Sequence, residues 1–295
     1  MAITKPAIDI SRETPGLIPL PAEISTEIWQ DAREASVIQR LGSRISLPAG
    51  GKKIPIITGD SEAEWVGETN EKPVGDASFD FKTITPYKAA LIELFSDEFR
   101  RDYNSLYAAL QERLPTALGA LFDKAALGFA ASPGTGFDTL AGSPSVTLNG
   151  YDDYLDVLEK VSDAKGKTTG WAFSDKAEIN ALRHVDKNGR PILIDKINTE
   201  GSVGSILARP VYKSQNVQSG DVIGVAGDWN TAYWGVVEDI SLSINTDGSV
   251  RKNGEDYHLW QRNMFAVRVE FEVGFAVRDD QRFVKLKAGS ATPGS

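Results

Sequence analysis

The clearest pattern in the chain is a strict alternation of apolar and polar positions close to its C-terminal end. From Phe265 to Val277 every second residue is Phe or Val, and Arg268, Glu270 and Glu272 lie between them. Successive side chains of a strand point to opposite faces of a sheet. The alternation therefore predicts one long strand with a buried face and a polar face.

The longest helical pattern begins at Ser96 or Asp97, either of which can cap the N-terminus of a helix. Apolar residues then recur at three- and four-residue spacing for about thirty residues, with Leu118 and Leu121 near the end. Pro115 lies within this stripe, where it removes a backbone donor and crowds the preceding turn. Because the pattern resumes directly afterwards, we expect one long helix with a kink at Pro115.

Three shorter stretches have the same helical spacing, and a run of strands follows them. We expect helices over 21–38, over 151–162, and from Ser174 to just before Gly189. Between 192 and 244, short apolar runs alternate with turns and predict a mixed sheet that carries helices. The inward-facing residues are expected to be Tyr154, Leu155, Leu158 and Val161 in the second of these helices and Ala177, Ala181 and Leu182 in the third.

Two segments have too few apolar positions to build a core of their own. Residues 1–20 are rich in proline and predict an extended arm. Residues 45–90 form two extended flanks around a polar stretch, 60–77, and a two-stranded projection of this length is marginal in water. Both segments are therefore expected to lie against another surface. The alternative for the loop is a hairpin folded back on its own domain, but its long polar tip gives that domain little to bury.

Composition narrows the classes of function. The 295 residues include 41 acidic and 32 basic side chains, which disfavours a tight, sequence-independent grip on a phosphate backbone. There is no cysteine, so disulfides and thiolate metal sites are excluded and a reducing cytoplasm is expected. The first residues lack the apolar core of a signal peptide, and no apolar run is long enough to span a membrane.

Motifs for conventional catalysis are missing from the sequence. It has only His184 and His258, and no GxSxG, GxGxxG or Walker motif. Residues 245–248, Asn-Thr-Asp-Gly, resemble part of a calcium loop, but Gly254 stands where the closing glutamate belongs. We therefore expect the tip of a hairpin at 245–248, and we expect neither a metal nor a cofactor.

Several short segments along the chain form a recognisable series. They are Leu-Ile-Pro at 17–19, Trp-Val-Gly-Glu at 65–68 with Lys-Pro at 72–73, Phe-Ser-Asp-Glu-Phe at 95–99, Gly-Arg-Pro at 189–191, Gly-Asp-Trp at 227–229, and Gln-Arg-Asn-Met-Phe-Ala-Val-Arg at 261–268. Taken together, these segments resemble the major capsid proteins of tailed double-stranded DNA bacteriophages, whose HK-ninety-seven-type fold is shared with encapsulin nanocompartments. The resemblance covers essentially the whole chain. No single segment is diagnostic, but their order and spacing agree.

The resemblance implies an α+β fold with an N-terminal arm, an extended β-hairpin loop, a long spine helix, a peripheral domain and an axial domain. It implies a structural protein rather than an enzyme. The implied ranges are 1–21 for the arm, 46–90 for the loop, 135–258 for the axial domain, and 22–45, 91–134 and 259–295 for the peripheral domain with its spine helix.

By the same resemblance, copies would self-assemble as hexamers and pentamers into an icosahedral virion shell in the bacterial host cytoplasm. The shell would enclose double-stranded DNA without sequence-specific binding or a membrane, and its partners would be a portal and separate scaffold or decoration proteins. Many relatives begin with a helical scaffolding segment, whereas here the arm begins near Met1. A separate scaffold, no scaffold and a processed end therefore remain open. An encapsulin-type shell protein is the alternative function, and a soluble hydrolase or lectin is the third choice.

The resemblance also implies a covalent cross-link. In some members of the family, a loop lysine attacks an asparagine near the start of the final strand, with a glutamate nearby. By motif position these roles fall on Lys72, Asn263 and Glu270, and Trp65 is the best candidate for an interface anchor. Seven residues of strand span about 23 Å and end on opposite faces, so different copies would have to supply Asn263 and Glu270.

Each of these residues also has a structural interpretation. Lys72 is then a solvated loop charge and Asn263 a turn residue. Glu270 is then an ion-pair partner of Arg268 or Arg278.

Overall fold

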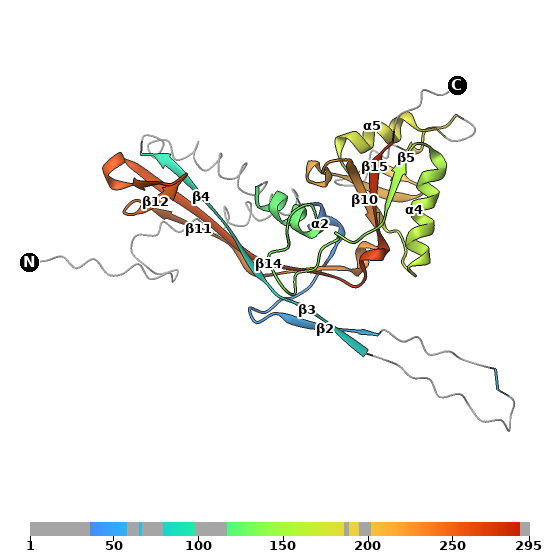
Figure 1. The fold of residues 1–295 in the computed structure, drawn as a ribbon, viewed down its shortest axis with the longest axis horizontal. Helices are drawn as coiled ribbons and strands as arrows, with labels where there is room; N and C mark the ends of the chain where they lie inside the picture. Colours follow the sequence, from blue (N-terminus) through green and yellow to red (C-terminus); the bar gives the residue numbers. More distant parts are fainter. Residues whose placement is uncertain are drawn as a thin grey trace, which may run out of the picture.

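The computed structural model describes residues 36–57, 65–66, 79–97, 117–185, 189–194 and 202–289. Within them, a four-stranded sheet and a seven-stranded sheet form two bodies, and a two-stranded hairpin projects away from both (Figure 1). This is the α+β architecture expected from the sequence. The expected arm, the loop tip around Lys72 and the helix around Pro115 lie outside the described residues.

The four-stranded sheet contains the long strand that the alternation predicted. β14 (Met264–Val277) pairs with β11 (Ala232–Asn245) on one side and β4 (Tyr87–Ser96) on the other, both antiparallel, and β1 (Ser43–Arg44) adds a short parallel edge to β11. All seven Phe and Val residues of the alternation are buried, and Arg268, Glu270 and Glu272 are partly exposed on the other face. The prediction of a half-buried strand is confirmed.

Helical residues 117–126 and α2 (Val37–Leu41) cover the apolar face of this sheet. Phe122 meets Phe275 of β14 edge to face at 6.1 Å between ring centroids, and Leu118 is buried beside it. Leu121, expected on the same stripe, is 49% exposed. That expectation is wrong, because Leu121 is one position from Phe122 and so lies about 100° further around the helix.

The seven-stranded sheet confirms the mixed sheet expected from the sequence. β15 pairs with β5 and β6 pairs with β9 in parallel, and the other neighbours are antiparallel. Its core includes Trp171 and Phe173, whose rings meet edge to face. In sheet order the strands are β5 (Ser145–Leu148), β15 (Phe283–Ala288), β10 (Val222–Gly227), β6 (Gly170–Phe173), β9 (Arg209–Lys213), β8 (Ser202–Ile206) and β7 (Leu193–Ile194).

Two helices, α4 (Tyr151–Asp163) and α5 (Asp175–Arg183), pack on this sheet. Both were expected, and Ser174 caps α5 by accepting a hydrogen bond from the backbone of Ala177. Two inward assignments are wrong, since Leu155 is 41% and Leu182 is 52% exposed. Each is adjacent in sequence to a better-placed position of the buried stripe. The stripes consist of Tyr154, Val157 and Val161 in α4 and Ala177 and Ala181 in α5.

The hairpin consists of β2 (Lys52–Ile57) and β3 (Phe79–Ile84), the two flanks expected from the sequence. Its base is attached to the four-stranded sheet, where buried Ile84 packs with Leu47 and Ala276. Asp138 makes a second attachment, because its Oδ2 accepts from Lys82 Nζ at 2.9 Å and from the backbone N–H of Val277 at 3.1 Å. The hairpin therefore starts from a fixed point in the sheet.

The turn at 245–248 is not the tip of a hairpin. It joins β11 to β12 (Ser249–Lys252), but β11 pairs with β14, and β12 pairs with β13 (Glu255–His258). The tip of that small hairpin is instead at Asn253 and Gly254, both at positive φ. The remaining short elements are the 3-10 turns η2 (Gln215–Val217), η3 (Trp229–Thr231), η4 (Trp260–Arg262) and η5 (Asp280–Arg282).

Two strands join the bodies in a way that chain order does not show. β11, from the range 135–258, lies in the four-stranded sheet, and β15, from the range 259–295, lies in the seven-stranded sheet. The domain ranges therefore remain a prediction. β11 and β15 each lie in a sheet whose other strands come from outside their own predicted range.

Candidate functional site

Three strand ends meet at one end of the four-stranded sheet and build the candidate site. Met264 at the start of β14 is opposite Ser96 at the end of β4, and Ala266 is opposite Asn245 at the end of β11. Antiparallel pairing therefore brings the residues that follow β4 and β11 next to those that precede β14.

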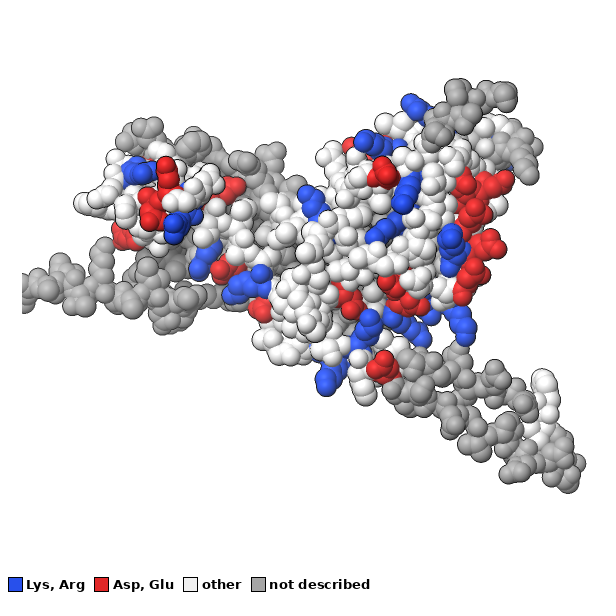
Figure 2. Space-filling model, in the orientation of Figure 1, with Lys and Arg blue, Asp and Glu red and all other residues white. Residues whose placement is uncertain are grey.

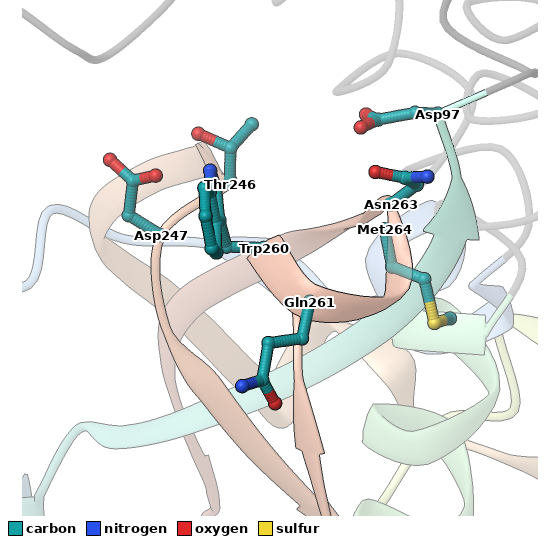
Figure 3. Close-up of a pocket in the computed structure, with 7 residues that line it drawn as sticks. All are labelled: Asp97, Thr246, Asp247, Trp260, Gln261, Asn263 and Met264. Atoms are coloured by element: carbon teal, nitrogen blue, oxygen red, sulfur yellow. The ribbon is translucent and has the colours of Figure 1, made fainter.

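A cavity of about 600 Å³ opens at this end of the sheet (Figure 3). Two carboxylates, two side-chain amides and an exposed indole contribute to its walls. Among the described residues that line it there is no lysine or arginine. The lining residues are Asp97, Thr246, Asp247, Trp260, Gln261, Asn263 and Met264.

Asn263 is held on the cavity wall by its backbone. It follows η4 with φ 49° and ψ 52°, in the left-handed region that asparagine adopts more readily than most residues. Its carbonyl oxygen accepts a hydrogen bond from the backbone N–H of Asp97 at 2.7 Å. Asn263 is thus a turn residue, and its amide is at the same time placed on an accessible surface.

Asp97 is the second notable residue of the cavity. Its Oδ1 is buried and has no hydrogen-bond partner in the part of the chain that the structure describes. A buried polar atom without a partner is uncommon in folded proteins and calls for an explanation. The sequence had suggested Asp97 only as a helix cap, and its place in the cavity follows from strand pairing that the sequence alone does not reveal.

The predicted cross-link residues are not brought together within one chain. Lys72 lies outside the described residues. Glu270 is within β14 and does not line the cavity of Asn263. Its carboxylate oxygens lie 3.5 Å from Arg268 Nε and 3.8 Å from Lys88 Nζ, so one chain holds Glu270 in an ion-pair cluster.

The tryptophans that the structure describes divide into two groups. Trp171, Trp229 and Trp234 are fully buried in the cores, whereas Trp65 is fully exposed and Trp260 is 78% exposed. Large aromatic side chains bury much apolar area when they gain a partner and are enriched at interfaces. Their exposure makes Trp65 and Trp260 suitable for contacts with other chains.

A second carboxylate that sequence reasoning missed lies in the core, away from the cavity. Asp123 is fully buried in helical residues 117–126, and burial raises its pKa from 3.8 to about 6 even though its hydrogen bonds lower it. It accepts from Ser36 Oγ at 2.7 Å, from the backbone N–H groups of Val37 and Ile38, and from Asn216 Nδ2 at 3.0 Å. One aspartate thus joins three separate segments. The sequence contains one signal for this role, since Asp123 is a charged residue within an otherwise apolar helical stripe.

Among the described residues, no group of three or more His, Asp or Glu side chains is arranged to hold a metal ion. None of the helices described is long and apolar enough to cross a membrane.

Comparison with known proteins identifies the family. The phage capsid family matches residues 16–288. The probable major capsid protein gp17 of Mycobacterium phage L5 is 32% identical over 92% of this chain and 90% of that protein, and its counterpart in Mycobacterium phage D29 is 30% identical over 90% and 89%. The chain belongs to the phage capsid family.

Solved structures agree on the fold. A chain of Gordonia phage Cozz superposes with a TM-score of 0.69 at 21% identity, covering 86% of this chain and 87% of that one. A chain of Mycobacterium phage Adephagia gives a TM-score of 0.70 at 15% identity, covering 88% and 92%. The HK-ninety-seven-type fold expected from the sequence is confirmed.

The functional class follows from the family and these relatives. The chain is a major capsid protein, a structural protein that assembles with other copies into the shell of the virion. The encapsulin-type shell and the soluble hydrolase or lectin find no support among these relatives.

Proposed function

We propose that this major capsid protein assembles as hexamers and pentamers into an icosahedral shell around phage double-stranded DNA, and that an isopeptide bond between Lys72 and Asn263 links neighbouring copies. Family membership supports the shell. The observation that carries the covalent part is the position of Asn263 on the wall of an open cavity, where a side chain from another copy can reach its amide.

The surface charge suits a container for DNA. The net charge is −9, and acidic side chains gather along α4 on the face seen in Figure 2, with basic ones interspersed over the rest of the body. Each phosphate neutralised by a protein cation would add an attachment between shell and genome. An acidic subunit therefore encloses the polyanion without gripping it.

The proposed contacts between copies use the two segments that the sequence predicts to lie against another surface. The arm and the extended loop lie on neighbouring copies, and Trp65 is the anchor of the loop contact because its whole side chain is available for burial. Assembly takes place in the bacterial host cytoplasm with a portal and separate scaffold or decoration proteins. The domains of this proposal are 1–21, the arm; 46–90, the loop; 135–258, the axial domain; and 22–45, 91–134 and 259–295, the peripheral domain with its spine helix.

The proposed link forms without an oxidant or cofactor. Lys72 Nζ attacks Cγ of Asn263, the new C–N bond forms, and ammonia leaves with the former amide nitrogen. At pH 7 only about one ordinary lysine in 2,500 is neutral, so a group must first accept the proton of the ammonium. The family resemblance assigns this step to Glu270, which would have to come from another copy.

Assembly is tested by electron microscopy of the purified protein, which should show closed shells with fivefold and sixfold capsomers. A monodisperse small oligomer at high protein concentration would contradict the proposal. This measurement is independent of the covalent link.

The link is tested by boiling purified particles in denaturant before electrophoresis. Wild-type particles should give a ladder of multiples of 32.0 kDa, and mass spectrometry should find the two peptides joined with loss of one ammonia. Lys72→Arg keeps the charge but cannot supply a neutral amine, and Asn263→Asp tolerates the left-handed backbone but removes the amide. Each should give only monomer. A ladder that persists in either variant rules out this pair of residues.

A further inference from the structure

We infer that Asp97 receives the lysine of a neighbouring copy in the cavity beside Asn263 and accepts the proton of its ammonium group. This inference rests on the proposed link between Lys72 and Asn263, and it places the carboxylate in the same chain as the asparagine.

The first argument is position. Asp97 and Asn263 both line the cavity, and their backbones are joined by the 2.7 Å hydrogen bond. Figure 3 shows the Asp97 carboxylate next to the Asn263 amide on one wall, with Trp260, Thr246 and Asp247 on the opposite wall. A side chain that enters between these walls meets the carboxylate and the amide together.

The second argument is an unmet hydrogen-bonding capacity. Oδ1 of Asp97 is buried and lacks a hydrogen-bond donor among the described residues, whereas a carboxylate oxygen normally accepts at least one. A lysine ammonium carries three donors and a positive charge. It would satisfy this oxygen while its carbon chain extends toward the cavity mouth.

The third argument is the character of the cavity. Asp247 supplies a second carboxylate on the facing wall, and the guanidinium of nearby Arg262 is stacked over Tyr257 at 4.5 Å from the ring centroid. Among the described residues that line the cavity there is thus no lysine or arginine, and the cavity is suited to a cation from another copy. The exposed indole of Trp260 offers an apolar face to the lysine stem and a favourable quadrupole to its charge.

Glu270 is less suited to the same task. Its two oxygens already face Arg268 and Lys88, so an incoming ammonium would compete with two resident cations. It also lies about 23 Å along the strand from Asn263 and would have to be supplied by a further copy.

The proposed step balances as follows. The ammonium of Lys72 transfers one proton to the Asp97 carboxylate and becomes a neutral amine. The amine attacks Cγ of Asn263, its remaining surplus proton moves to the departing nitrogen, and ammonia is released. The Asp97 carboxyl then returns its proton to ammonia, so one ammonium ion leaves and the carboxylate is restored.

The central test is the rate of ladder formation in assembled Asp97→Asn particles. Asparagine has nearly the same shape as aspartate and keeps the backbone hydrogen bond to Asn263, so the variant removes the proton acceptor with little change to the described structure. The rate should fall at least about 100-fold, and what remains should rise about tenfold per pH unit, because solvent must now deprotonate the amine. Glu270→Gln should link at a rate within about threefold of wild type, because Asp97 and not Glu270 accepts the proton. Asp152→Asn, which removes an exposed carboxylate from the first turn of α4, is the matched control and should link at the wild-type rate.

Mixed particles test whether the carboxylate acts on the asparagine of its own chain. Copies with Lys72→Arg keep an intact cavity, and copies with Asp97→Asn keep the lysine, so co-assembly of the two should restore links. Co-assembly of Asp97→Asn with Asn263→Asp copies should not, since neither chain then holds both cavity residues. If Asp97→Asn copies do not form particles by themselves, they can be incorporated into particles by co-assembly with wild-type copies.

The outcomes separate the two proposals. Wild-type particles without a ladder overturn the link and this inference with it. A wild-type ladder that Asp97→Asn leaves at its normal rate, or that Glu270→Gln alone abolishes, overturns the role of Asp97 and leaves the link standing.

Discussion

Two buried carboxylate oxygens in this subunit have opposite surroundings. Asp123 lies deep in the core, where donors from two other segments, residues 36–38 and Asn216, satisfy it. Asp97 lies at the end of the four-stranded sheet, where Oδ1 has no donor in the part of the chain that the structure describes. The difference teaches that the hydrogen bonds of Asp123 are complete within one copy, whereas the described residues leave Oδ1 of Asp97 without a donor, which the proposed lysine would supply.

The strongest test of this comparison removes the carboxylate of the core. Asp123→Ala leaves Ser36, the start of α2 and Asn216 without their common acceptor, and buried donors without partners are costly. We expect the free energy of unfolding to fall on the order of 3 to 5 kcal/mol. Urea denaturation of the unassembled subunit measures it. A loss below about 1 kcal/mol would mean that water replaces the carboxylate at no great cost.

A smaller effect is expected from pH. The pKa of Asp123 is raised from 3.8 to about 6 by burial, so the folded chain binds this proton more tightly than the unfolded chain. The contribution of the carboxyl to stability is therefore complete below pH 3.8 and is lost as the pH rises through about 6. Relative to Asp123→Asn, wild type should gain on the order of 1 kcal/mol between pH 7 and pH 5. If the free energies of unfolding of wild type and Asp123→Asn changed equally between pH 7 and pH 5, this prediction would be contradicted.

The cavity carboxylate should behave differently. Asp97→Asn removes the charge of a side chain whose Oδ1 is unsatisfied in the described chain, so the free energy of unfolding should be unchanged within about 0.5 kcal/mol or should rise slightly. Asp247→Asn in the exposed turn is the control. A destabilisation of more than about 2 kcal/mol would show that Asp97 supports the fold of its own chain.

The smallest effect on the isolated subunit is expected at Trp65. Because its side chain is fully exposed, Trp65→Ala should leave the free energy of unfolding within about 0.5 kcal/mol of wild type. The yield of closed shells should nevertheless decrease, because an anchoring aromatic side chain is lost from the contact between copies. Light scattering during assembly measures this yield. Normal assembly of the variant would remove Trp65 from the interface.

Much of the fold could be predicted from the sequence because its signals are local. The alternation of residues predicts β14 without information from other segments, and Ser174 is a helix-capping residue that indicates the start of α5. The errors at Leu121, Leu155 and Leu182 have one physical origin. Each leucine lies at the edge of the buried stripe of its helix. Whether a residue at that edge is buried depends on the neighbouring segment that packs against the helix, which the local sequence does not show.

The candidate site was only partly predictable. Asn263 was found through a family resemblance, whereas the carboxylate beside it was not, since the two are separated by more than 160 residues. Only the register of β4 against β14 makes Asp97 its neighbour. Asp247 was noted as part of a turn, and its place opposite Asn263 depends on the end of β11.

The attachment at the base of the hairpin has a mechanical consequence. The carboxylate of Asp138 holds Lys82 in β3 and the backbone of Val277 in β14 at the same time. A force that pulls on the hairpin is thus transmitted to the end of β14 by Asp138 and by the packing of Ile84 with Leu47 and Ala276. Tension that a neighbouring copy placed on the hairpin would therefore pass into the four-stranded sheet, and the hairpin would not carry it alone.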